Sequence, residues 1–389
     1  MSVTELQGNW NYPTTIRFGV GRINELSDVC ATLGMSYPLL VTDAGLIKLS
    51  LVADIVENCE SNGMRVSVFS DVKSNPSGNN IKMGVLAYNA GGHDGVIALG
   101  GGSALDAAKA IALMVGQTRS LWDFEDVGDN WMRVDIDGMV PVIAIPTTSG
   151  TGSEVGRASV IVDESIPLKK IIFHPKMLPE LVIADPQLTV GLPPQMTAAT
   201  GMDALVHNLE AYCAPAYHPM ADGIAVEAIK LVKNWIFQAY SHGDDLVARS
   251  HMMSASMMGA TAFQKGLGGV HALAHPLGAV YDAHHGLLNA ILLPYVLVRN
   301  RDAIEQKVAD LAYLLSLQNS TFDGFIDWIV ELRAQLNIQH DLSSIVGDES
   351  RVAEVARLAT EDAASAGNPL FLSAEDYSQV LTNAIRGDL

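Results

Sequence analysis

The sequence has few cysteines, few basic residues and no long uninterrupted apolar run. Its 3 cysteines are odd in number and widely spaced, which fits a reducing cytoplasm better than a disulfide framework. Only 24 Lys and Arg residues stand against 43 Asp and Glu residues, and the net charge of −19 argues against nucleic acid and anionic membranes as partners. The apolar stretch 287–298 is interrupted by Asn289 and Pro294 and is too short to cross a bilayer. Residues 1–11 lack a cationic stretch followed by an apolar run, so no signal peptide is expected and we place the protein in the cytoplasm.

The composition is that of a folded chain with more than one domain. Hydrophobic residues make up 49% of the sequence and charged residues 17%, which excludes a disordered protein. A chain of 389 residues is longer than one hydrophobic core usually serves, so two domains are expected.

The first half, residues 1–185, alternates short apolar runs with helical stretches. The runs are closely followed by Gly, Asp, Ser or Pro, as buried parallel strands are, and they cover residues 38–42, 65–69, 95–99 and 141–145. Residues 54–63 and 81–91 have the pattern of amphipathic helices. Strand and helix in alternation predict an α/β domain with a doubly wound parallel sheet.

The second half, residues 186–389, is expected to be all-α. After Asp185-Pro186 the strand-like runs nearly vanish, which makes this step the predicted domain boundary. The long helical segments predicted beyond it are residues 197–213, 220–240, 245–259, 302–315 and 323–336.

Polar residues in the helical half occur at a spacing that suits metal binding. Asp203 and His207 are four residues apart, and so are His271 and His275, so each pair projects from one helix face. Their neighbours are mainly Ala, Leu, Val and Gly, which indicates buried helices rather than polar surfaces. Imidazoles with one carboxylate suit Fe(II), Zn(II) or another divalent first-row metal and leave a coordination position open for a substrate oxygen.

The first half contains a glycine-rich turn that suits a phosphate group. The expected strand 95–99 runs into the turn 100–103 and then into a helix that Ser103 is expected to cap. Asp43 follows an earlier strand, where it would bind ribose hydroxyls and repel a 2′-phosphate, which favours NAD over NADP. The stretch 147–154 adds hydroxyl groups after a further strand.

These motifs together resemble the iron-containing, or group III, alcohol dehydrogenase family. The resemblance runs from Phe18-Gly19 to Asn368-Pro369, and its most specific stretches are residues 100–103, 147–154, 199–205 and 271–278. It implies a nucleotide-binding α/β domain, a helical metal-binding domain as in dehydroquinate synthase, and catalysis in the cleft between them.

The resemblance also assigns roles to individual residues. The metal ligands would be Asp203, His207, His271 and His285. The cofactor contacts would be Asp43, Asn75, Gly100, Gly101, Gly102, Ser103, Thr147, Thr148, Thr151 and Lys169. His275 would be a catalytic residue beside the metal, near the nicotinamide. Family members often have Pro-His-Gly where this chain has His284-His285-Gly286, so two imidazoles compete for one ligand role, and we choose His285 because it precedes the glycine.

The resemblance implies an enzyme that interconverts a small alcohol and its aldehyde or ketone by hydride transfer. NAD and a divalent metal would be its cofactors, with iron favoured by the resemblance and zinc chemically admissible. A homodimer is expected because similar proteins are often dimers. Gly156 stands where many members have a Thr, and Ala158 stands where some members have a larger polar side chain near the substrate, so the resemblance does not transfer the identity of the substrate.

Three other functional classes remain as alternatives. A metal- and NAD-dependent lyase resembling dehydroquinate synthase would need several basic residues around the metal, yet Lys265 is the only Lys or Arg between residues 250 and 298. A metal hydrolase without a nucleotide would leave Asp43 and the glycine turn unexplained. A non-catalytic binding protein is disfavoured because the ligand set is complete.

Overall fold

The computed structural model describes residues 12–166 and 168–389, which form two compact units. One unit covers Tyr12–Gly191, and the other contains residues 192–389. The division follows Gly191, a few residues beyond the Asp185-Pro186 step at which the sequence predicts the domain boundary. Residues 1–11, for which the sequence predicts no signal peptide, lie outside the described residues.

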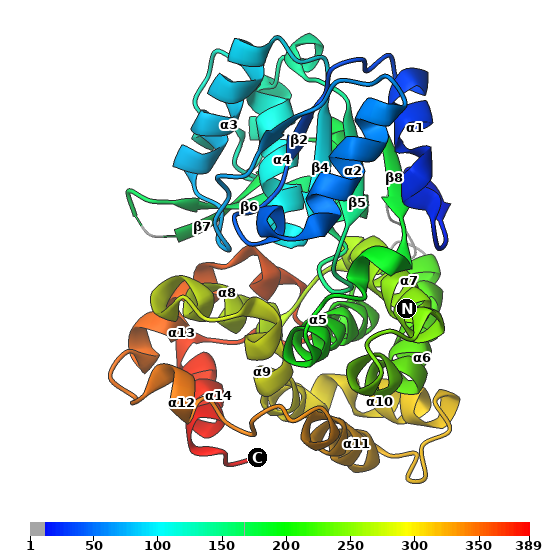
Figure 1. The fold of residues 1–389 in the computed structure, drawn as a ribbon. Helices are drawn as coiled ribbons and strands as arrows, with labels where there is room; N and C mark the ends of the chain where they lie inside the picture. The colour runs from blue at the N-terminus through cyan, green and yellow to red at the C-terminus, as the bar shows by residue number, and fades with distance from the viewer. Residues whose placement is uncertain (1–11, 167) are drawn as a thin grey trace. The chain divides into compact units, whose positions relative to one another are not determined.

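A six-stranded parallel sheet forms the centre of the first unit (Figure 1). Its strand order is β1-β8-β5-β4-β2-β3, and every neighbouring pair is parallel. The strands are β1 (Thr15–Phe18), β2 (Leu39–Val41), β3 (Ser67–Phe69), β4 (Val96–Gly100), β5 (Val142–Pro146) and β8 (Leu181–Ala184). Strands β4, β5 and β8 are buried along their whole length, which explains their unbroken apolar sequences.

Helices cover both faces of this sheet. They are α1 (Leu26–Thr32), α2 (Ser50–Ser61), α3 (Gly78–Gly91) and α4 (Gly102–Met114). Helices α1 and α2 pack against the sheet face that Leu40, Ile97 and Ile143 line, and α3 and α4 lie on the other side in Figure 1. Gly84 lets α3 approach α4, because a Cβ at this position would lie 2.1 Å from Ile111 Cδ1. The predicted doubly wound α/β fold is confirmed.

Four strands of the first unit were not predicted from the sequence. Strand β1 is only partly buried and has no continuous apolar run, whereas β8 is a buried apolar run of four residues that the prediction missed. Strands β6 (Ala158–Asp163) and β7 (Leu168–Phe173) form a separate antiparallel pair outside the main sheet. Such a half-buried hairpin lacks the continuous apolar run by which the central strands are recognised.

The second unit, residues 192–389, has helices and no strand among its described residues (Figure 1). Its helices are α5 (Pro194–Cys213), α6 (Pro219–Ser241), α7 (Leu246–Ala262), α8 (Gly269–Tyr281), α9 (His285–Arg299), α10 (Arg301–Leu314), α11 (Phe322–Gln335), α12 (Ser343–Val346), α13 (Val352–Glu361) and α14 (Ala374–Arg386). Helix α5 is buried from Thr197 to its end, because its small side chains let α6, α7 and α9 pack around it. The predicted all-α second domain is confirmed.

Helix α9 shows how the unit tolerates a proline inside a buried helix. Pro294 has no N–H group, which leaves backbone carbonyls in the preceding turn without their usual partners. The buried Arg333 lies against this turn, and its Nη1 donates to Ile291 O at 2.9 Å.

Nowhere in the described part of the chain is a helix both long and apolar enough to span a membrane.

Candidate metal centre and nucleotide site

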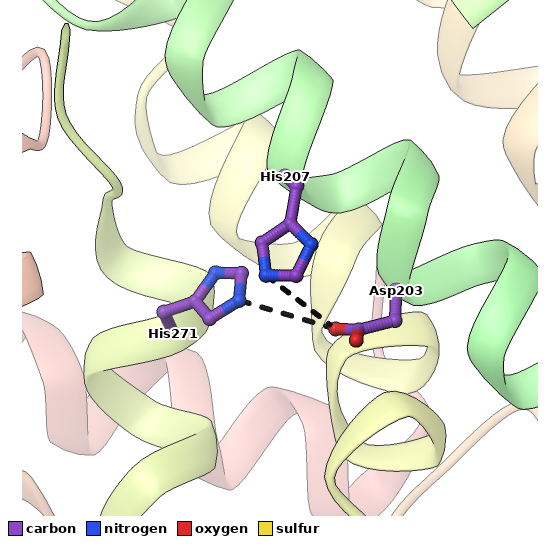
Figure 2. Close-up of side chains that lie close together, drawn as sticks. All are labelled: Asp203, His207 and His271. Atoms are coloured by element: carbon purple, nitrogen blue, oxygen red, sulfur yellow. Dashed lines mark ion pairs between the residues drawn. The ribbon is translucent and has the colours of Figure 1, made fainter. Parts of the chain in front are cut away.

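Three helices of the second unit bring four possible metal ligands close together, and three of the four are buried. Asp203 and His207 lie one turn apart on α5, His271 lies in the first turn of α8, and His285 is the first residue of α9. The Nε2 atoms of His207, His271 and His285 lie 3.9, 4.0 and 3.7 Å from Asp203 Oδ1. Figure 2 shows the His207 and His271 rings directed toward the Asp203 carboxylate.

The distances fit one divalent cation. Asp203, His207 and His271 each offer one ligand atom, and these atoms all lie within 4.8 Å of one another. His285 joins this group through its short distance to Asp203. A first-row cation binds N and O ligands at about 2.0–2.2 Å, so two ligands of one ion lie at most about 4.4 Å apart. Each separation of 3.7 to 4.0 Å therefore allows Asp203 and that histidine to bind one ion together.

Glu210 holds the His271 ring from the side opposite Asp203. It is buried on α5, one turn beyond His207, and its carboxylate accepts hydrogen bonds from His271 Nδ1 at 2.6 Å, Val270 N at 2.7 Å and Gly268 N at 2.9 Å. The bond from Nδ1 fixes the tautomer and leaves the Nε2 lone pair for a metal. Burial raises the pKa of Glu210 to about 7 and lowers the pKa of His271 well below its ordinary value, which favours the neutral, metal-binding imidazole.

Asn289 places its amide against three of the ligand atoms. It follows His285 by four residues on α9, so the two side chains project from the same helix face. Its Nδ2 lies 2.7 Å from Asp203 Oδ1, 3.1 Å from His271 Nε2 and 3.2 Å from His285 Nε2. An amide nitrogen has two protons for these three acceptors. The point is therefore rich in acceptor atoms and poor in donors, which suits a cation.

Two close backbone approaches set the spacing of the ligand helices. A Cβ on Gly286, next to His285, would lie 2.4 Å from the backbone oxygen of Ala199 on α5. A Cβ on Gly259 of α7 would lie 2.7 Å from the Asn208 side chain and 3.1 Å from His207 Cβ. Glycine at these two positions lets α9 and α7 come this near to α5 beside the ligands.

His275 and His284 lie near the ligands but have other partners. His275 Nδ1 is 2.9 Å from Asp362 Oδ2, and its ring stacks on the His285 ring with centroids 5.3 Å apart. His284 caps α9, where its Nδ1 accepts a hydrogen bond from Leu287 N at 3.4 Å. Of the two adjacent imidazoles, His285 is therefore the one whose Nε2 faces Asp203.

In the first unit, the glycine turn (residues 100–103) and the loop 147–154, which we call the threonine loop, pack directly on each other. Strand β4 ends at Gly100, whose φ of +147° is a conformation that favours glycine. Thr147 N donates to Gly100 O at 3.0 Å. A Cβ on Gly101 would lie 3.2 Å from the side chain of Thr148, and a Cβ on Gly102 would lie 2.6 Å from that of Thr151.

Asp43 lies beside the same turn. Its Oδ1 accepts hydrogen bonds from Gly45 N at 2.8 Å and Leu46 N at 2.9 Å, which fixes the carboxylate at the end of β2. Its Oδ2 is 3.6 Å from the position that a Cβ on Gly100 would take. The predicted carboxylate and the predicted phosphate cradle are thus neighbours in the folded unit.

Ser103 does not cap α4, and this prediction is wrong. The helix begins at Gly102, with an extended Gly101 at the N-cap and no side-chain cap. Because the glycines let the helix begin earlier, Ser103 lies inside its first turn and its hydroxyl donates to Ser74 O. This bond ties the loop that carries Asn75 to the glycine turn.

Lys169 and Lys170 follow each other on β7, so their side chains leave opposite faces of the hairpin. Lys170 is engaged within the unit, because its Nζ lies 3.2 Å from Asp163 Oδ2 and 3.4 Å from Glu125 Oε2. Lys169, whose register partner is Val162, points the other way.

Two charged residues of α4 hold the threonine loop, and neither was predicted from the sequence to have a role. Asp106 accepts hydrogen bonds from Ser153 Oγ at 2.5 Å and Val160 N at 2.9 Å. Lys109 is buried, and its Nζ donates to Ser153 O at 3.0 Å and to Ala158 O. Their three-residue spacing on a helix is the signal that could have revealed them. Glu210 could likewise have been found, because it lies on the α5 face that carries Asp203 and His207.

Comparison with known proteins gives consistent matches along both units. Residues 13–186 match the model of the family described as iron-containing alcohol dehydrogenase, and residues 197–385 match that of the Fe-containing alcohol dehydrogenase family, C-terminal. The chain is 37% identical over 385 residues to 4-hydroxybutyrate dehydrogenase of Cupriavidus necator, covering 96% of this chain and 99% of that protein. It is 34% identical over 382 residues to 1,3-propanediol dehydrogenase of Klebsiella pneumoniae, covering 96% and 97%.

Solved structures of alcohol dehydrogenases and related reductases also match nearly the whole chain. A crystal structure of 1,3-propanediol oxidoreductase superimposes with a TM-score of 0.92 at 32% identity, covering 97% of this chain and 99% of that one. Sulfoacetaldehyde reductase of Bifidobacterium kashiwanohense, solved in complex with NAD+, gives a TM-score of 0.88 at 28% identity, covering 97% and 99%.

Proposed function

The chain belongs to the iron-containing alcohol dehydrogenase family and is an oxidoreductase acting on CH–OH donors, and from this premise we propose how its residues divide the work. The observation that carries the proposal is the buried cluster of Asp203, His207 and His271, with the partly exposed His285 3.7 Å from Asp203. The relatives are dehydrogenases, so the lyase alternative has no support among them.

Asp203, His207, His271 and His285 are the proposed metal ligands, and Fe(II) is the proposed metal. Three neutral imidazoles and one carboxylate suit iron and zinc alike, and the family favours iron. The bound cation supplies Lewis acidity at the substrate oxygen, which favours loss of its proton in oxidation and polarises a carbonyl group in reduction. With a divalent ion the site keeps a net charge of +1, because Asp203 is the only anionic ligand.

NAD is the proposed hydride acceptor and binds to the first unit. The N-terminus of α4 with the glycine turn would hold its pyrophosphate, and Asp43 would accept hydrogen bonds from the adenosine ribose. Thr147, Thr148 and Thr151 would contact the phosphates or the nicotinamide. Asn75, Ser103 and Lys169 complete the proposed contacts, and a carboxylate at position 43 disfavours NADP.

His275 is the proposed proton carrier. Its Nδ1 is engaged by Asp362, so its ring is placed by a residue other than a metal ligand. Its four-residue spacing from His271 keeps it on the ligand face of α8, and its ring lies parallel to that of His285. General acid–base catalysis of this kind typically contributes about 10² to 10⁴ in rate.

The test separates the histidines by what each variant loses. NADH formation is measured across short alcohols, diols and hydroxy acids after anaerobic loading with iron, and bound metal is measured on each purified variant. His271→Ala and His285→Ala are expected to lose metal and turnover together. His275→Ala should keep its metal and lose about 10² to 10⁴ in rate.

His284→Ala is the matched control, because it removes an imidazole next to His285 without removing a proposed ligand. It should retain most of the metal. A metal-free His284→Ala with normal metal in His285→Ala would reverse the assignment, and a metal-free His275→Ala would remove the distinction between ligand and proton carrier.

A further inference from the structure

We propose that Asp362 is a positioning residue, which orients the His275 ring and holds it in the tautomer with the proton on Nδ1, so that Nε2 presents its lone pair to the reacting alcohol. The proposal rests on the proposed role of His275 and adds a second residue to it. The two side chains are 87 positions apart in the sequence and meet at 2.9 Å in the fold.

The two oxygens of Asp362 have separate partners. Asp362 follows α13 and forms the N-cap of the short helix η11 (Ala363–Gly367). Its Oδ1 accepts a hydrogen bond from Ala364 N at 2.9 Å, and its Oδ2 lies 2.9 Å from His275 Nδ1. The first bond fixes the carboxylate, and the fixed carboxylate then fixes the imidazole. The two side chains are only 18% and 15% exposed, so water competes little for this bond.

The protonation of the ring follows from the chemistry of the pair. An ionised carboxylate accepts hydrogen bonds and has no proton to donate, so a neutral imidazole that bonds to it carries its proton on Nδ1. Nε2 then carries the lone pair. The ring is also held by its neighbours, since it stacks on His285 at an interplanar angle of 10° and meets the His271 ring edge-on with centroids 5.7 Å apart.

This arrangement accounts for the proton that the reaction releases. Oxidation breaks a C–H bond and an O–H bond of the alcohol, and NAD bound to the first unit would accept the hydride with both electrons of the C–H bond. The proton of the O–H bond remains, and Nε2 binds it with its lone pair. The resulting imidazolium cation lies against the Asp362 carboxylate, which compensates the new charge until the proton leaves for solvent.

The decisive variant is Asp362→Asn. Asparagine caps a helix about as well as aspartate, so η11 is retained. Its amide, however, offers either a donor or an acceptor to Nδ1 and no longer requires the proton to be there. We expect kcat to fall at least tenfold, with bound metal and the KM for NAD near the wild-type values. If Asp362 serves only as a cap, Asp362→Asn will have wild-type kcat and the proposal is overturned.

A double-mutant cycle tests whether Asp362 acts through His275. Asp362→Ala is expected to lower kcat in the wild-type chain, yet the double variant with His275→Ala should match His275→Ala alone within about twofold, because residues that act as a unit are not additive. Independent losses that multiply in the double variant would refute the link. A wild-type rate in His275→Ala would instead refute the proposed role of His275 itself.

Asp245→Ala is the matched control for losing a cap. Asp245 caps α7 by accepting hydrogen bonds from Val247 N and Ala248 N, and its other side-chain partner, Gln238, is not a proposed ligand. It should lower the melting temperature while kcat and bound metal stay unchanged. A loss of kcat in Asp245→Ala as large as that in Asp362→Asn would attribute both losses to destabilisation and overturn the proposal.

Discussion

Replacing Glu210 with glutamine should weaken metal binding although Glu210 is not a proposed ligand. The carboxylate has donors on both sides, with Val270 N facing Oε1 and both Gly268 N and His271 Nδ1 facing Oε2. A glutamine amide turned either way sets its NH2 group against an N–H donor. With the NH2 group in the place of Oε2, the His271 proton has to move to Nε2, which removes the lone pair that the metal needs. With the NH2 group in the place of Oε1, the Val270 N–H loses its acceptor and His271 Nδ1 bonds to a neutral amide oxygen instead of a carboxylate, so the ring is held less firmly.

The expected loss can be set against known effects of such partners. Removing a hydrogen-bond partner of a ligating histidine typically costs 10- to 100-fold in metal affinity, which corresponds to about 1.4 to 2.8 kcal/mol. We expect the loss of metal affinity in Glu210→Gln to lie near the upper end of this range, because His271 Nδ1 forms its 2.6 Å hydrogen bond with this carboxylate in a buried site.

The assay is a competitive titration of metal-free protein with Fe(II) under anaerobic conditions, in the presence of a chelator of known affinity. Glu227→Gln is the matched control, because Glu227 lies on α6 with a side chain that is 54% exposed. Circular dichroism of the metal-free variants checks that both remain folded. A folded Glu210→Gln variant that binds Fe(II) with the affinity of the control would refute the reasoning.

Three further changes test the first unit. Asp43→Gly should raise kcat/KM with NADP relative to NAD, because it removes a negative charge beside the ribose site, and a wild-type preference for NADP would contradict the assignment. Lys169→Ala should weaken NAD binding, measured by fluorescence titration, far more than Lys170→Ala, whose lysine is held by Asp163 and Glu125; equal effects would remove the distinction. Burial raises the pKa of Glu154 from 4.5 to about 7, so its contribution to stability is present below pH 4.5 and is lost as the pH rises through 7. Glu154→Gln should therefore increase the free energy of unfolding at pH 8.5 by up to about 3 kcal/mol, and denaturant titrations should show the gain shrinking toward pH 5.5.

The local parts of the architecture could be predicted from the sequence, whereas long-range contacts could not. Buried strands such as β4 and β5 can be predicted from their continuous apolar runs. Asp203 and His207 can be predicted as a pair from their four-residue spacing within one helix. The prediction that Ser103 caps α4 is wrong because the start of this helix depends on the backbone conformation of Gly101. A glycine allows many backbone conformations, so the sequence does not determine this one.

Among the residues around the candidate site, too, only those close in sequence to a predicted site residue could have been predicted. Asn289 stands four residues after His285, and this spacing could have drawn attention to it. Asp362 stands 87 positions from His275 in a segment without any motif, so only the folding of α13 beside α8 brings the two together. Its role could not have been inferred before the fold was known.

The contacts of Gly286 and Gly259 have a consequence for the choice of ion. Because α9 and α7 contact α5 through backbone and Cβ atoms beside the proposed ligands, the proposed site could widen for a larger ion only if these helices moved apart. We therefore expect the site to disfavour a large ion such as Ca²⁺, which needs six to eight oxygen ligands. The size of the proposed site does not distinguish Fe(II) from Zn(II), because the radii and bond lengths of these two ions are close. If the proposed site binds a metal, we expect the supply of the two ions to decide which of them occupies it.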